Sequence, residues 1–158
     1  MTKYDDASWH YEGDFPADLP PEHGATHMGM LLTWCIQNDF LAQELSEELA
    51  DEVQAVKNRS LTGTSFLLTH CDGKLMEEDL NEKGNAFIRD YYDDETVFAT
   101  KFQDYFSDYA QVFDISINEE YLDHNQLYRV ENTWSNYDLL FPIIQERFAQ
   151  WQSLYSQE

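Results

Sequence analysis

Basic residues are scarce in this sequence of 158 residues: nine Lys and Arg stand against 31 Asp and Glu, a formal net charge of −22. A chain with so few cations cannot build a surface that holds phosphates, which excludes nucleic acid and anionic membranes as partners. The same negative field attracts cationic partners and speeds their encounter. High negative charge also serves solubility or adaptation to salt. The composition therefore favours a basic partner without requiring one.

Cysteine and long hydrophobic runs are also scarce. The two cysteines, Cys35 and Cys71, form neither a disulfide framework nor a zinc motif. Cys35 lies among Leu, Trp and Ile, which is typical of a buried thiol. No stretch approaches the ~20 consecutive apolar residues that span a bilayer, and residues 1–6 show no apolar signal segment. We therefore expect a cytoplasmic protein.

Apolar residues are nevertheless frequent enough for a packed core, at 42% of the chain with 15% aromatic. The length fits one ordinary domain, and we expect a single domain over residues 1–158. Residues 1–22 contain prolines and four aromatics, so we expect them to form an N-terminal arm packed against a helical body, residues 23–158.

Hydrophobic spacing predicts a mainly α fold: a compact helical domain. Helices are expected at about residues 22–38, 46–57, 96–110 and 135–155, with a further helical face that carries Phe87, Ile88, Tyr91 and Tyr92. Gly24 and Gly29 weaken the first helix, which indicates close packing of another segment there. The run 66–68 fits a strand or a helix. Alternation over residues 112–117 marks a candidate short β element.

Catalytic motifs are missing. The sequence has no Gly-rich phosphate loop, no Gly-x-Ser-x-Gly elbow and no His-Glu-x-x-His. His70 and Cys71 are adjacent, so their side chains point in different directions and do not make an activated thiol. We therefore predict no catalytic residue, no cofactor and no enzymatic activity.

One group of residues keeps a metal-binding alternative open. His23 and His27 stand four apart near a helix start, where both side chains can face one point, and His10, Asp14 or Glu22 could complete a ligand set. Five histidines in this length produce such a pair by chance, and packing of His27 against Trp9 or Trp34 is the favoured interpretation. Acid doublets such as Asp5-Asp6 are expected on a solvated face.

Three runs mix carboxylates with large aromatic side chains, within residues 90–95, 104–109 and 119–123. Tyrosine supplies contact area at low entropic cost, and carboxylates accept bidentate hydrogen bonds from Arg. At helical spacing, at least half of these aromatics belong to the core. The predicted partner-binding residues are Asp90, Tyr91, Tyr92, Asp93, Asp94, Glu95, Asp104, Tyr105 and Asp108.

Several segments together resemble one bacterial family of small acidic proteins, some of which are grouped with the immunity proteins of toxin systems. The N-terminal pattern is the most specific part of the resemblance, which spans nearly the whole chain. The segments are 4–7, 9–10, 13–16, 18–20, 24–30 with Trp34, 79–81, 84–87, 91–92, 133–138 and 147–148. The resemblance implies a bacterial cytosolic protein that neutralises a toxin domain, and it supplies no catalytic residues.

The leading hypothesis combines this resemblance with the charge. The protein is expected to be an immunity protein that binds and neutralises a basic toxin domain, such as a nuclease, because such domains must hold phosphates. The first alternative is a metal-binding protein or enzyme centred on His10, Asp14, His23 and His27. The second is an acidic adaptor or homo-oligomer-forming domain.

Overall fold

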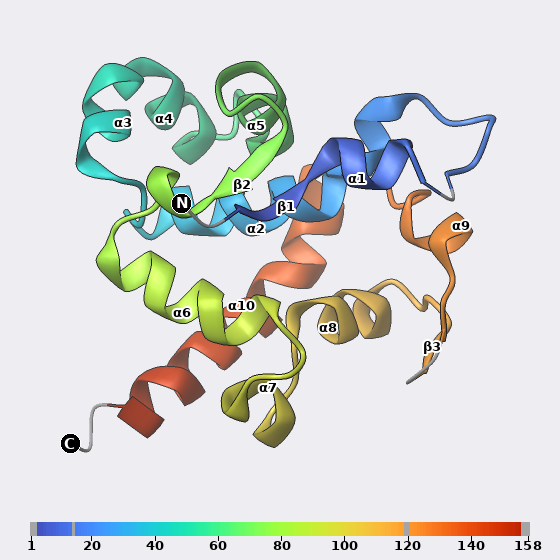
Figure 1. Cartoon of the computed structure of the whole chain (residues 1–158). Helices are drawn as coiled ribbons and strands as arrows, with labels where there is room; N and C mark the ends of the chain where they lie inside the picture. The colour runs from blue at the N-terminus through green and yellow to red at the C-terminus, as the bar shows by residue number, and fades with distance from the viewer. Residues whose placement is uncertain (1–2, 14, 119–120, 156–158) are drawn as a thin grey trace.

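The computed structural model describes residues 3–13, 15–118 and 121–155. Short strands and helices precede one long C-terminal helix (Figure 1). In chain order the elements are β1 (Lys3–Asp6), α1 (Ala7–Tyr11), the 3-10 helix η1 (Pro21–Ala25), α2 (Thr26–Gln37), α3 (Gln43–Glu48), α4 (Ala50–Lys57), α5 (Gly63–His70), β2 (Lys74–Met76), the 3-10 helix η2 (Glu77–Asp79), α6 (Glu82–Tyr92), α7 (Val97–Lys101), α8 (Tyr105–Val112), β3 (Ile117–Asn118), β4 (Tyr121–Leu122), α9 (His124–Leu127) and α10 (Trp134–Tyr155). The mainly α prediction is confirmed.

Helix α2 is the centre of the molecule. Every residue from Thr26 to Ile36 is buried, because the helix is apolar on nearly all sides and the other elements surround it. The antiparallel pair β1–β2 lies in front of α2, and α10 runs diagonally across the body toward the C-terminus (Figure 1). Strand β1 thereby brings the N-terminal arm onto the central helix.

Two glycines allow α2 and α5 to cross at very short range. A Cβ on Gly29 would lie 2.0 Å from Oγ1 of Thr64, and a Cβ on Gly63 would lie 1.9 Å from Oγ1 of Thr33. Real Cβ atoms do not approach other atoms so closely, so only glycine fits at either position. The prediction of close packing at Gly29 is confirmed, and α5 is the segment that packs there.

Aromatic side chains from α2, α6 and α10 fill the core. The ring of Trp34 lies 5.3 Å from that of Phe87 and 5.2 Å from that of Phe148, distances typical of favourable ring pairs. Trp151 packs on Phe148 in a stacked arrangement. Cys35 is free and fully buried beside this cluster, as its sequence context predicts.

Two of the predicted helices are divided in the structure, and one open assignment is settled. The expected helix at 96–110 is two helices, because Thr96 caps α7 and Asp104 caps α8 by accepting the backbone N–H of Ser107. The expected helix at 46–57 is likewise split at Leu49, where α3 ends and α4 begins. The open run 66–68 is helical within α5.

The short β element predicted at 112–117 is present but displaced, because only the last of these residues, Ile117, lies in a strand, β3. Val112 ends α8, and Asp114 then adopts a positive φ of 56°, a left-handed conformation that Asp tolerates and that terminates the helix. Only Ile117–Asn118 is extended, pairing with Tyr121–Leu122. The sequence prediction also missed β1 and β2, which are short and pair across some seventy residues of chain.

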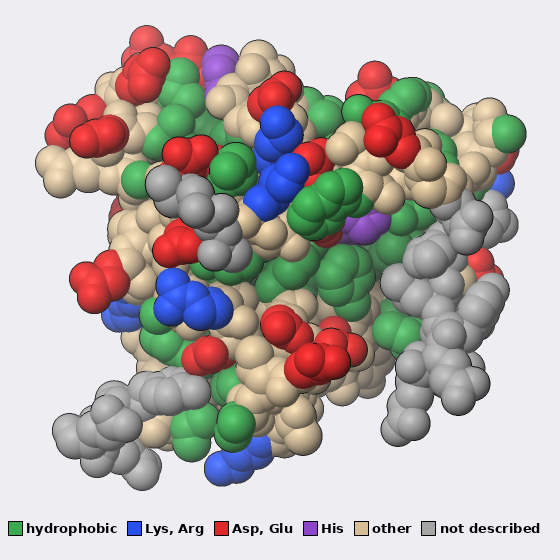
Figure 2. Space-filling view, in the orientation of Figure 1, with side chains coloured by type: hydrophobic (Ala, Val, Ile, Leu, Met, Phe, Trp, Pro, Cys, Tyr) green, Lys and Arg blue, Asp and Glu red, His purple; other side chains and the backbone are tan. Residues whose placement is uncertain are grey.

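The surface is strongly acidic, and most basic side chains are already paired. Seven of the nine Lys and Arg residues form ion pairs with carboxylates, and Lys83 and Lys101 lie over aromatic rings. Figure 2 shows acidic side chains gathered over α3. Within the described ranges, no helix combines the length and apolar content needed to cross a membrane.

Candidate functional site

The acid doublet Asp5-Asp6 lies at the junction of β1 and α1, and both residues are buried, with 4% and 5% of their surface exposed. The prediction that this doublet lies on a solvated face is therefore wrong. Asp6 is buried because it caps α1, accepting the backbone N–H of Ser8 at 2.9 Å, and because it pairs with Lys3. Asp5 points the other way, into the body, as alternation along a strand requires.

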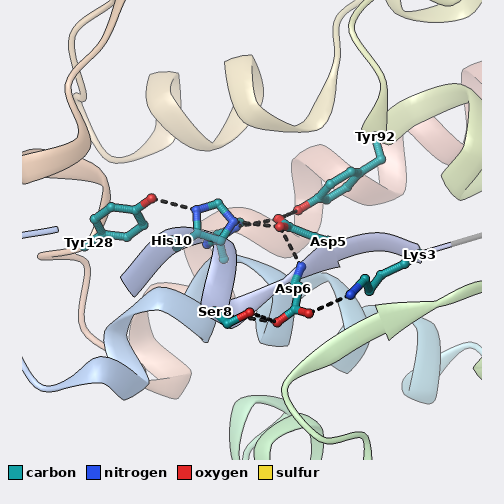
Figure 3. Close-up of polar contacts among 8 residues, drawn as sticks. Lys3, Asp5, Asp6, Ser8, His10, Tyr92 and Tyr128 are labelled. Carbon is teal, nitrogen blue, oxygen red and sulfur yellow. Dashed lines mark hydrogen bonds and ion pairs between the residues drawn. The ribbon is translucent and has the colours of Figure 1, made fainter. Parts of the chain in front are cut away.

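The carboxylate of Asp5 is the centre of a buried polar cluster (Figure 3). Nε2 of His10 lies 2.7 Å from Oδ1, and Nε2 of His27 lies 3.0 Å from Oδ2. The hydroxyl of Tyr92 donates to Oδ2, and the backbone N–H of Asp6 donates to Oδ1 at 2.8 Å. Four donors from four segments thus satisfy one carboxylate, which a buried charge requires.

The cluster continues outward through His10. Its Nδ1 lies 2.6 Å from the hydroxyl of Tyr128, and its side chain remains 15% exposed. Figure 2 shows a histidine at the surface beside α1, next to hydrophobic side chains. We call Asp5, His10, His27, Tyr92 and Tyr128 the Asp5 cluster. It is buried at its base and reaches solvent at His10.

His27 is the innermost member of the cluster, with 1% of its surface exposed. Its ring lies 4.5 Å from that of His10 in an edge-on arrangement and also contacts Phe106 and Tyr109. The prediction that it packs against Trp9 or Trp34 is wrong, because α8 supplies the aromatic neighbours. Among the described residues, none lies within hydrogen-bonding distance of its Nδ1.

Burial and hydrogen bonding set the charges of the cluster. Burial alone would raise the pKa of Asp5, but the hydrogen bonds from His10 and His27 outweigh it and hold that pKa well below its usual range. Burial lowers the pKa of His27 more than Asp5 raises it, so this imidazole is neutral near pH 7. Burial, with the adjacent Asp5 charge, raises the pKa of Tyr92 well above its usual value.

The structure brings together only part of the ligand set considered from the sequence. His10 and His27 converge, and with Asp5 they place three ligand atoms within 4.8 Å of one another. His23 does not join them, because its Nδ1 lies 2.7 Å from the backbone oxygen of Tyr128. Asp14 lies outside the described residues, and Glu22 is exposed on η1. The carboxylate that lies beside His10 and His27 is that of Asp5, which the sequence analysis did not include in the ligand set.

Five of the nine predicted partner-binding residues lie inside the protein. Tyr91 donates to Asp108, Tyr92 donates to Asp5, and Tyr105 donates to the backbone oxygen of His27 at 2.5 Å. Asp104 caps α8, and Asp108 pairs with Arg147 on α10. These side chains hold α6, α8 and α10 together and do not present themselves to a partner.

The other four residues lie nearer to solvent. Asp93, Asp94 and Glu95 are exposed in the turn that follows α6. Asp90 is half-buried and accepts a hydrogen bond from Nε1 of Trp151 at 2.9 Å. Of the third mixed run, residues 119–120 lie outside the described ranges.

A separate acidic hollow, which we call the α3 groove, lies between α3 and η2. It has a volume of about 680 Å³. The backbone N–H of Ala42 donates to the oxygen of Asp79 at 2.9 Å and a bridge joins Leu41 to Leu80, which fixes its two sides. Its lining residues are Ala42, Gln43, Glu44, Leu45, Glu47, Glu48, Glu78, Asp79 and Asn81. Five carboxylates around one hollow can bind a cationic side chain through charge-assisted hydrogen bonds.

The protein is thus a small helical domain with a buried Asp–His cluster and an acidic groove. Residues 3–123 match the family described as "Domain of unknown function (DUF7832)", and since this is well over half of the chain, the protein belongs to that family. The matched segment includes Asp5, His10, His27 and Tyr92 and ends before Tyr128 and α10. No curated protein and no solved structure gave a significant match.

Proposed function

We propose that the protein binds a basic protein partner and inhibits it, as an immunity protein that neutralises a bacterial toxin domain. The observation that carries the proposal is the uncompensated acidic surface: a formal charge of −22 remains while seven of nine basic residues are already paired. Such a surface attracts a basic protein and speeds its association. The family resemblance noted in the sequence supports the same role.

The α3 groove is the contact surface that fits this role best. Its carboxylates line one hollow, so an Arg or Lys side chain placed there meets several hydrogen-bond acceptors. The exposed turn Asp93–Glu95 also carries three adjacent acids, but they follow one another along the chain, whereas the groove draws its acids from two segments. We therefore assign partner contact to the groove and electrostatic steering to the remaining acids.

The test compares inhibition of a panel of basic nuclease toxin domains by three forms of the protein. The groove variant carries Glu44→Gln, Glu47→Gln and Glu48→Gln. The control variant carries Glu12→Gln, Glu22→Gln and Glu146→Gln, three exposed positions outside the groove, and has the same net charge.

We expect the native protein to inhibit a member of the panel and the groove variant to bind that domain at least about tenfold more weakly. The control variant should lose less than about threefold, because rim charges contribute little to affinity. Equal losses in the two variants, or no inhibition of any domain, would contradict the proposal. A dimer seen by light scattering that dissociates only in the groove variant would favour the homo-oligomer alternative.

A further inference from the structure

The Asp5 cluster has a composition that the proposed binding function does not use. Two imidazole nitrogens and one carboxylate converge there from β1, α1 and α2. The two histidine rings are nearly perpendicular, at 79°. This donor set, two His with one acidic residue, is the kind that binds zinc at sites where a fourth position stays open.

We propose that Asp5, His10 and His27 form a binding site for a zinc-class divalent metal ion. The three ligand atoms lie within 4.8 Å of one another, and a tetrahedral zinc ion with bonds of about 2.0–2.1 Å needs its ligands roughly 3.4 Å apart. The partly exposed His10 provides the route of entry and the side on which the open position faces solvent.

The groups behind the ligands have the arrangement of a supporting shell. Tyr128 lies at Nδ1 of His10, and when that nitrogen donates its proton to the tyrosine oxygen, Nε2 carries the lone pair that a metal requires. Tyr92 and the backbone N–H of Asp6 orient the carboxylate of Asp5 from behind. These contacts fix the directions of both ligands before a metal ion arrives.

Charge also favours a cation at this position. The carboxylate of Asp5 lies within hydrogen-bonding distance of both imidazole rings. A divalent ion bound there takes the place of the Nε2 protons that face the carboxylate, and each imidazole ring then carries its proton on Nδ1. The overall charge of −22 raises the local concentration of cations around the protein.

The test is a zinc titration of chelator-treated full-length protein in excess Mg²⁺, which occupies weak surface carboxylates. Isothermal calorimetry gives the stoichiometry, and Co²⁺ used as an optical probe reports the ligand geometry through its visible absorption. The variants are His10→Ala, Asp5→Asn and a control, His70→Ala, which removes an exposed histidine on α5. Circular dichroism establishes that each variant is folded.

We expect one zinc ion per native chain, an affinity at least about 100-fold lower in His10→Ala, and no change in His70→Ala. The Co²⁺ absorption should be of the tetrahedral type and should vanish in His10→Ala. Because His10 lies at the surface end of the cluster, its replacement leaves the core in place. If Asp5→Asn does not fold, imidazole ¹⁵N shifts of the native protein still report zinc binding at His10 and His27. Absence of stoichiometric binding, or equal binding by His10→Ala and native protein, overturns the proposal.

Discussion

At the scale of single residues, Asp5 carries a buried charge because its hydrogen-bonding capacity is fully used. His10, His27, Tyr92 and the backbone of Asp6 all contact its two oxygens. Carboxylates on the surface need no such partners, and most of the 31 acids in this chain are of that kind. Among acids that sequence alone treats as equivalent, burial and partners distinguish four from the exposed ones: Asp5, Asp6, Asp104 and Asp108.

Asp79 gives a prediction about pH. Burial in the α3 groove, with Glu78 nearby, raises its pKa to about 6. A carboxyl whose pKa is higher in the folded state than in the unfolded state destabilises the fold as pH rises through that interval. Asp79→Asn should therefore stabilise the protein by about 1 kcal/mol at pH 7, allowing for solvent screening.

The gain from Asp79→Asn should shrink as the pH falls from about 6 to the ordinary pKa of 3.8, below which the native side chain is mostly protonated in both states. Urea denaturation of native and variant protein at a series of pH values measures it. Glu12→Gln, at an exposed position, serves as the control and should show no such trend. A gain that does not change with pH would show that ionisation of Asp79 is not its cause.

Only part of the Asp5 cluster is predictable from sequence. His10 and His27 are identifiable as candidates, because imidazole is a common metal ligand and His27 lies in the first turn of an apolar helix. Asp5 is not identifiable, because it is one acid among 31 and its burial depends on pairing of β1 with a strand some seventy residues away. Tyr92 and Tyr128 are not identifiable either, because only the folded chain brings them next to Asp5 and His10. Local patterns contain no information on such distant contacts.

At the scale of elements, the crossing of α2 and α5 depends on glycine. Gly29→Ala should destabilise the protein by about 3 kcal/mol, because its Cβ would overlap Thr64 and force the two helices apart. Gly13→Ala is the control, since its nearest neighbour would be the oxygen of Trp9 at 3.3 Å. Thermal denaturation measures both. Similar melting temperatures for the two variants would contradict the tight crossing.

The pairing of α8 with α10 gives a second prediction at this scale. Arg147 contacts both oxygens of Asp108, which is fully buried, at 3.0 and 3.1 Å. Arg147→Met should cost about 3 kcal/mol, because it leaves a buried carboxylate without its cation. Arg59→Met breaks the exposed pair with Asp138 and should cost no more than about 1 kcal/mol. Equal losses in chemical denaturation would refute this account of the α8–α10 contact.

Helices were predictable where their apolar spacing is long and regular, as in α2 and α10. The division of the expected helix at 96–110 into α7 and α8 was not predictable. Thr96 and Asp104 can be identified as helix caps only from the backbone conformation in the folded chain. Tyr91, Tyr92 and Tyr105 show the same limit. Spacing indicates that they share helical faces, but their burial in the folded chain shows that they belong to the core.

At the scale of the whole molecule, two kinds of acid have separate roles. A few are buried and hold elements together, and the others cover a surface on which most of the cations are already paired. The first kind belongs to the architecture and to the Asp5 cluster. The second kind sets the field that a partner meets, which is the physical basis of the proposed inhibition of a basic protein.

The most direct measurement of that claim is the association rate constant of the native protein with a basic toxin domain that it inhibits, followed by stopped flow as a function of NaCl concentration. The account predicts a rate that falls by at least about tenfold between roughly 20 and 200 mM NaCl, while the dissociation rate changes much less. An association rate that does not depend on salt would contradict the claim that the acidic surface recruits the partner.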